Sequence, residues 1–120
     1  MKFIHTTEFW TRKSVEADKI RVYVFGDNMD KAGMAGQACI RGLDNAYGIP
    51  TKVHPCTSNQ SCYFSDHSFQ ENCRIIQQAF NEIPNTTVVV NVNIGRGLAQ
   101  MHETAPKTYK FLCDLLKIPN

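Results

Sequence analysis

The fold is decided by the stretch IRVYVFGDNMDKAGMAGQACIRG, residues 20–42. Its first six residues are mostly β-branched or aromatic, which predicts a buried strand over residues 20–25. Gly26, Gly33 and Gly36 follow, where the chain turns and where a ligand can approach the backbone. Residues 36–43 are predicted to form a short helix. A strand, a glycine loop and a helix N-terminus together favour an anion site; the alternative is an ordinary glycine-rich turn.

A second unit of the same kind is predicted near the C-terminus. The apolar run at residues 88–92 predicts a buried strand, which leads into the loop NIGRGLA at residues 93–99. A helix is expected to begin near Thr104, with Pro106 in its first turn. Two such units would place two sets of backbone N–H groups at the carboxyl edge of one parallel sheet, where open α/β sheets bind ligands. Two facing loops suit a diphosphate better than a single anion.

The remaining segments complete the predicted order of elements. Residues 7–17 are expected to form a helix capped by Thr6 or Thr7, and residues 45–50 a short strand ending at Pro50. Residues 51–61 are polar and are expected to be the most mobile loop. A helix is predicted from Ser65 to about Asn81. This order predicts one α/β domain over residues 1–120, a three-layer α/β/α fold with a mostly parallel sheet.

Composition limits the classes of function. The chain has 120 residues, a net charge of +2 and 42% hydrophobic residues, which suit one globular core. No apolar run approaches a transmembrane span, and basic residues do not cluster, so a membrane or nucleic-acid partner is not expected. The N-terminus has no apolar leader segment, so a cytoplasmic location is expected. Five cysteines are therefore expected to be reduced thiols: Cys39, Cys56, Cys62, Cys73 and Cys113.

Few residues suggest chemistry, and each has a plainer explanation. Asp27 and Asn28 follow the first strand, but both residue types also form turns. Lys52 follows the middle strand and could reach a ligand at the same edge, or could be a solvated loop lysine. The histidines and cysteines between His54 and His67 match no common zinc spacing, so neither a metal nor another cofactor is predicted. No cysteine–histidine pair is placed by the sequence as a nucleophile and base.

The two glycine loops resemble those of macrodomains, the α/β fold that binds ADP-ribose. Asn28 with the loop GMAG at residues 33–36 resembles the first macrodomain loop, and IGRGL at residues 94–98 resembles the second, diphosphate-holding loop. The sequence IPTK at residues 49–52 is similar to the lysine segment of the terminal ADP-ribose protein glycohydrolase subgroup. Short phage and bacterial proteins share the same series of motifs. The resemblance extends over about residues 20–116.

The resemblance implies site residues and a function. The implied ligand-binding residues are Asn28, Gly33, Met34, Ala35, Gly36, Gln37, Lys52, Ile94, Gly95, Arg96, Gly97 and Leu98. The implied function is a reader or sequestering module for ADP-ribose or a related NAD-derived nucleotide. The first alternative is an ADP-ribosyl hydrolase with Lys52 as nucleophile or electrophile and Asp27 as acid or base. The second alternative is an interaction protein that has lost its site.

Two departures from the glycohydrolase pattern favour binding over turnover. Ala99 occupies the position of the aspartate that this subgroup needs for catalysis, and Glu103 is the nearest acid downstream. The upstream Gly-Asp-Ile segment that holds adenine is absent.

Two further expectations concern the loops around the ligand. Residues 51–64 are expected to form a lid over it, with Tyr63 or Phe64 stacking on the base; alternatively both aromatic residues belong to the core. A bulky side chain at Gly95 is expected to block the diphosphate without unfolding the domain.

Overall fold

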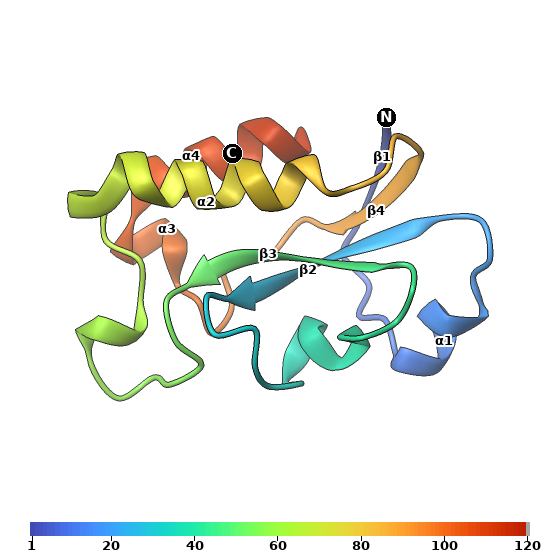
Figure 1. Cartoon of the computed structure of the whole chain (residues 1–120), viewed down its shortest axis with the longest axis horizontal. Coiled ribbons are helices and arrows are strands. Elements are labelled where there is room, and N and C mark those ends of the chain that lie inside the picture. The colour runs from blue at the N-terminus through green and yellow to red at the C-terminus, as the bar shows by residue number, and fades with distance from the viewer. Residues whose placement is uncertain (120) are drawn as a thin grey trace.

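Four parallel strands form the centre of the molecule in a computed structural model that describes residues 1–119 (Figure 1). They lie in the order β1-β4-β2-β3 and pair in parallel throughout. Their bounds are β1 (Lys2–Thr6), β2 (Val22–Asn28), β3 (Ala46–Lys52) and β4 (Thr87–Asn91).

Helices cover both faces of this sheet, as Figure 1 shows. The two longest, α2 (Phe69–Asn81) and α4 (Pro106–Leu116), pack side by side on one face. The other face carries α1 (Arg12–Ala17) and the 3-10 helix η1 (Gly36–Ile40). Three one-turn helices complete the chain: η2 (Gln60–Cys62), η3 (Asp66–Ser68) and α3 (Met101–Thr104). The predicted α/β/α architecture with a parallel sheet is therefore confirmed.

Alternating residues of the central strands build two separate cores. Because successive side chains of a strand point to opposite faces, Val88 and Val90 of β4 join the core beneath α2 and α4, whereas Val89 joins the core beneath α1 and η1. In β2, Val24 faces the first core and Tyr23 and Phe25 face the second. The larger core contains the apolar faces of the long helices α2 and α4, whereas the helices that cover the smaller core, α1 and η1, are short.

The N-terminal prediction was wrong in part. Residues 2–6 form a strand, β1, that pairs only with β4, and the helix begins at Arg12 rather than near residue 7. The helix is capped by Thr11, which exchanges hydrogen bonds with Ser14, and not by Thr6 or Thr7. The strand was missed because Lys2 and His5 interrupt its apolar pattern and its partner is 85 residues away in β4.

Two predicted strands end later than expected, and one helix is shorter. Strand β2 continues through Asp27 and Asn28, and β3 continues through Pro50 to Lys52. Proline is tolerated in β3 because this is an edge strand. The predicted helix at residues 36–43 is a 3-10 helix of 5 residues, too short to contribute a substantial helix dipole.

The later helices agree with the prediction. Ser65 caps η3, which leads directly into α2, and α4 has Pro106 at its first turn. Within residues 1–119, none of the helices has the length and hydropathy needed to span a bilayer.

Candidate functional site

A cleft of about 330 Å³ opens at the carboxyl edge of the sheet, where the strands β2, β3 and β4 end. The chain leaves β2 towards η1 on one face and leaves β4 towards α3 and α4 on the other, so neighbouring strands send their loops in opposite directions (Figure 1). Such a divergence is where open parallel sheets bind ligands. Its volume lies within the range of small-molecule sites, about 300–1,000 Å³.

Most of the predicted site residues line this one cleft. They are Asp27, Asn28, Gly33, Ala35, Gly36, Gln37, Lys52, Gly95, Gly97 and Leu98. Three predicted residues do not line it. Ile94 is buried in the larger core, Met34 is exposed on the first loop, and the guanidinium of Arg96 lies over the Tyr109 ring at 5.9 Å from its centroid. Glu103 is exposed on α3, also outside the cleft.

The first glycine loop presents unpaired backbone donors. Within residues 1–119, none of the N–H groups of residues 33–37 donates to another protein group. Gly33 and Gly36 have φ values of +93° and +58°, which glycine adopts at little cost. Successive N–H groups in such a turn form a concave anion-binding surface, and this replaces the helix dipole as the physical basis for an anion site here.

Two side chains hold this loop in place. The Asn28 amide donates to the Ala32 carbonyl at 2.8 Å. The Arg41 guanidinium donates to the Gly33 carbonyl at 2.8 Å and to both carboxylate oxygens of Asp27, at 3.0 and 2.6 Å. Both Asp27 oxygens are thus occupied by a buried ion pair, which leaves this carboxylate poorly placed as an acid or base.

A glycine in the neighbouring strand makes room for that ion pair. A Cβ atom at Gly48 would lie 2.6 Å from Asp27 Oδ2 and 2.9 Å from Phe25 Cζ. No real Cβ atom packs so closely, so Gly48 allows the Asp27 carboxylate to lie against β3.

The second glycine loop is built differently. Within residues 1–119, the N–H groups of Gly95, Gly97, Leu98 and Ala99 have no protein acceptor. A Cβ atom at Gly95 would point into the core, 3.1 Å from Met101 Sδ and 3.3 Å from Leu112 Cδ2. The expectation that a bulky residue at Gly95 would block ligand without unfolding the domain is therefore wrong. Gly97, which has open space around it, is the position that tests ligand approach.

Lys52 lines the cleft, and its ammonium group lies against the segment that follows β3. Lys52 is only 7% exposed. Its Nζ donates to the Cys56 carbonyl at 2.6 Å and lies 4.7 Å from the centroid of the Tyr63 ring. Burial lowers the pKa of Lys52 below its ordinary value. Within residues 1–119, no carboxylate pairs with this ammonium group.

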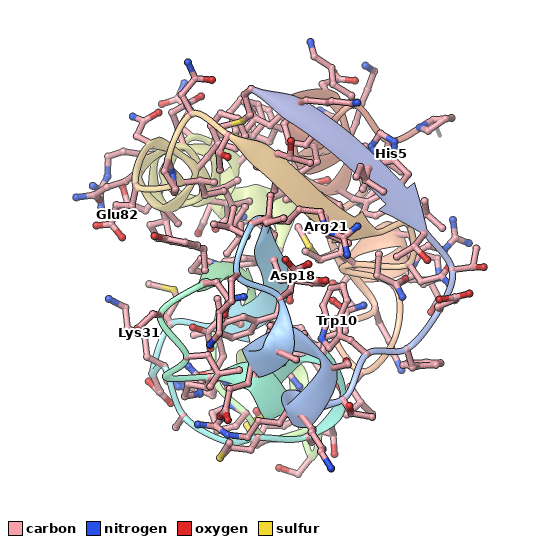
Figure 2. All side chains as sticks on the ribbon, turned by 90° about the vertical axis from the view of Figure 1, so that its right-hand side faces the viewer. His5, Trp10, Asp18, Arg21, Lys31 and Glu82 are labelled. Carbon is pink, nitrogen blue, oxygen red and sulfur yellow. A yellow bond between two sulfur atoms is a disulfide. The ribbon has the colours of Figure 1, made fainter. Side chains whose placement is uncertain are left out.

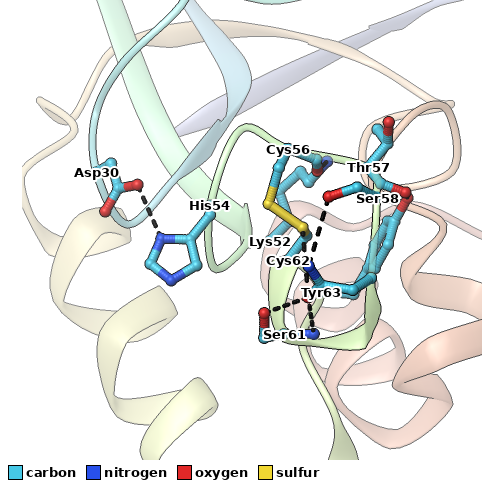
Figure 3. The surroundings of a disulfide bond; sticks show 10 residues. Asp30, Lys52, His54, Cys56, Thr57, Ser58, Ser61, Cys62 and Tyr63 are labelled. Atoms are coloured by element: carbon cyan, nitrogen blue, oxygen red, sulfur yellow. Dashed lines mark hydrogen bonds and ion pairs between the residues drawn. A yellow bond between two sulfur atoms is a disulfide. The ribbon is translucent and has the colours of Figure 1, made fainter.

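The segment that follows Lys52 is closed by a disulfide between Cys56 and Cys62 (Figure 3). The expectation that all five cysteines are reduced is therefore wrong; Cys39, Cys73 and Cys113 are free. The Cys62 carbonyl accepts from the N–H groups of Val53 and His54, so residues 53–62 form a closed loop beside the cleft.

Of the two alternatives for the aromatic residues of this segment, stacking on a base or belonging to the core, the core is correct for Phe64. Phe64 is 2% exposed in the larger core and cannot stack on a base, and the Tyr63 ring covers Lys52. His54 pairs with Asp30 at 2.8 Å. Within residues 1–119, no group of three or more histidine, cysteine or acidic side chains is placed to hold a metal ion.

Several residues of the site were not found from the sequence. Arg41 organises the first loop although it lies fourteen positions after its partner Asp27. Thr51 and Asn91 are buried polar residues at the carboxyl ends of β3 and β4. A polar residue at the end of an apolar strand is a signal of a site, but it can be used only when the strand is known to extend that far. Phe9 lines the cleft from the loop after β1. It was not predicted because strand β1 was missed and residue 9 was expected to lie in a helix.

An all-parallel sheet between two helical layers, with a cleft at its carboxyl edge, places the chain in the α/β class. Within that class it belongs to a family of unknown function, DUF7831, whose model matches residues 5–115. No curated protein and no solved structure matches the chain. The family match covers strands β2, β3 and β4, the end of β1, and both glycine loops.

Proposed function

We propose that the cleft binds ADP-ribose or a related NAD-derived nucleotide diphosphate, and that the protein is a macrodomain-like reader or sequestering module. The observation that carries this proposal is the pair of glycine loops on the rim of one cleft, where within residues 1–119 the N–H groups of residues 33–37 and of Gly95, Gly97, Leu98 and Ala99 have no protein acceptor. A diphosphate offers acceptors to both loops. Lys52, which has no carboxylate partner within residues 1–119, supplies a complementary charge.

Calorimetric titration tests the proposal directly. The probes are ADP-ribose, ADP, ribose 5-phosphate and inorganic pyrophosphate, each added to the full chain. ADP-ribose is expected to bind most tightly, and Lys52→Met is expected to weaken it about 10- to 100-fold, the range for losing one hydrogen bond to a charged group. Lys13→Met is the control, because Lys13 is exposed on α1 and does not line the cleft. Absence of binding by all four probes would favour an interaction protein that has lost its site.

The charge of Lys52 predicts a pH dependence of binding. An anion prefers the charged lysine, whereas burial lowers the pKa of this group in the free protein from the ordinary value of 10.5. Affinity is therefore expected to be constant at low pH and to fall as pH rises through that lowered pKa, with uptake of a proton on binding in this window. Titrations in buffers of different ionisation enthalpy measure the uptake. If the pH dependence of affinity is the same in Lys52→Met as in the wild type, Lys52 does not bind the ligand.

One observation favours hydrolysis as a second candidate. A nucleophilic lysine must lose its proton, and burial of Lys52 lowers its pKa in that direction. Against this, Asp27 is the one carboxylate lining the cleft among residues 1–119, and Arg41 occupies both of its oxygens. We expect no release of ADP-ribose from a glutamate- or aspartate-linked peptide. Release that disappears in Lys52→Arg, which keeps the charge but not the amine, would establish the hydrolase instead.

A cytoplasmic location, in the host cell if the chain is phage-encoded, is also a proposal. The Cys56–Cys62 disulfide argues against it, because disulfides persist mainly in oxidising compartments. Alkylation of free thiols in intact cells, followed by mass spectrometry, measures the redox state of this pair. A reduced pair would agree with the cytoplasm.

A further inference from the structure

An exposed aromatic ring stands at the rim of the cleft. Phe9 is 82% exposed and lines the cleft from the loop between β1 and α1. A phenylalanine side chain left in water gains none of the free energy of apolar burial, so the packing of the free protein does not account for its position. A flat apolar surface beside a cleft is what a planar ligand group needs for stacking.

The backbone around this ring is fixed on both sides. The Glu8 carbonyl accepts from the Asn91 amide at 3.0 Å, which ties the loop to the end of β4. On the other side of Phe9, the Trp10 indole donates to the Gln37 carbonyl at 3.3 Å, which ties the loop to η1. Figure 2 shows Trp10 near α1, on the same side of the sheet as that helix. Phe9 therefore sits between two anchored residues rather than on a free loop.

Gln37 lines the same cleft. Its Oε1 is buried and, within residues 1–119, has no hydrogen-bond partner. A buried acceptor without a partner has lost its hydrogen bonds to water without a replacement, a cost that a hydrogen bond from a bound ligand would remove. A carboxamide offers one acceptor and two donor hydrogens in one plane, which matches the amino group and N7 of adenine.

We propose that Phe9 and Gln37 form the base-binding subsite of the cleft, with the Phe9 ring stacked on an adenine-type base and the Gln37 amide bound to its amino edge. The inference rests on the proposed function, since it assigns the nucleoside end of a ligand whose diphosphate lies on the glycine loops. It also accounts for recognition of a base in a chain that lacks the Gly-Asp-Ile segment.

The experiment compares ligands that differ only in the base. ADP-ribose is titrated against inosine diphosphate ribose, in which an oxo group replaces the amino group, and against pyrophosphate, which has no base. Phe9→Ala is expected to weaken ADP-ribose about tenfold, on the scale of stacking contacts, and to leave pyrophosphate unchanged. Gln37→Leu is expected to abolish a preference of about tenfold for ADP-ribose over the inosine ligand. Ile20→Ala, at an apolar residue that is 85% exposed outside the cleft, is the matched control.

A second measurement separates this inference from the proposed function. Adenosine alone is added to the labelled protein, and the NMR shifts of the Phe9 ring are followed. Shifts at Phe9 without any diphosphate binding would support the subsite and overturn the proposed diphosphate site. Binding of ADP-ribose that is equal in wild type and Phe9→Ala, or a base preference that survives in Gln37→Leu, would overturn the subsite alone. No response to adenosine or to ADP-ribose would overturn both.

Discussion

The two glycine loops at the carboxyl edge of the sheet are alike in sequence but are held by different forces. Residues 29–36 are all exposed, and the side chains of Asn28 and Arg41 hold that loop through hydrogen bonds. In the second loop, Ile94, Gly95 and Ala99 are buried, and the loop is fixed by packing against Met101 and the residues of α4. Similar arrays of N–H groups can thus be built by a polar brace or by the apolar core.

The comparison has a consequence for glycine substitutions. Gly33 and Gly95 have similar backbone angles, with φ values of +93° and +82°. A Cβ atom at Gly33 would meet nothing within 4 Å, whereas one at Gly95 would press on the side chains of Met101 and Leu112. The same substitution at the two positions therefore separates backbone strain from overpacking.

The largest effect is expected for Gly95→Ala. The left-handed backbone costs about 1–2 kcal/mol for a residue with a Cβ atom, and overpacking a full core adds about 1–3 kcal/mol. We expect the free energy of unfolding to fall by about 3 kcal/mol, measured by urea denaturation. Gly97→Ala is the control, because Gly97 lies in the same loop with no positive φ and no neighbour within 4 Å. Equal effects at Gly95 and Gly97 would show that the second loop is not held by the core.

A smaller loss is expected for Arg41→Met, which removes the brace of the first loop. Breaking a buried ion pair costs about 3–5 kcal/mol, and the partial exposure of Arg41 reduces this to about 2 kcal/mol. Hydrogen exchange of residues 29–36 should accelerate while that of residues 93–99 stays unchanged. Faster exchange in both loops would mean that they form one cooperative unit. Arg12→Met is the comparison variant, because Arg12 is exposed on the same helical layer and donates to the Cys39 and Arg41 carbonyls instead of a carboxylate.

The smallest effect is expected for Gly33→Ala, where only the backbone conformation is penalised. We expect a loss of about 1 kcal/mol in the same urea measurement. The difference from Gly95→Ala, about 2 kcal/mol, then measures the packing of the second loop without the backbone contribution. A loss at Gly33 as large as that at Gly95 would contradict the open surroundings of this position.

Patterns that depend on local sequence predicted much of the fold. The run Val88–Val89–Val90 marks a strand buried on both faces, and the helical spacing of Ile76, Leu112 and their neighbours marks the two long helices. Strand β1 depends on pairing with a distant segment, so its own five residues carry a weak signal. The predicted sheet therefore had three strands and lacked the edge strand β1.

The site was predictable as far as strand topology determines it. Parallel strands bring their carboxyl ends together, and this placed both loops and Lys52 at one edge. Whether a side chain introduced at Gly95 or Gly97 would point into the core or into the cleft depends on the loop conformation, which the sequence pattern does not specify. The Asp27–Arg41 pair and the Cys56–Cys62 disulfide are likewise contacts that residue spacing alone does not single out.

The position of the single tryptophan makes intrinsic fluorescence a reporter of the cleft. Trp10 is the one tryptophan of the chain; its indole N–H binds the Gln37 carbonyl, and its ring meets Tyr23 edge-on at 5.5 Å. All tryptophan fluorescence therefore arises from Trp10, which contacts Gln37 and follows Phe9 in the sequence, and both of these residues line the cleft. Any ligand that orders Phe9 or Gln37 changes the surroundings of this fluorophore, so occupancy of that end of the cleft can be followed in unlabelled protein by emission alone.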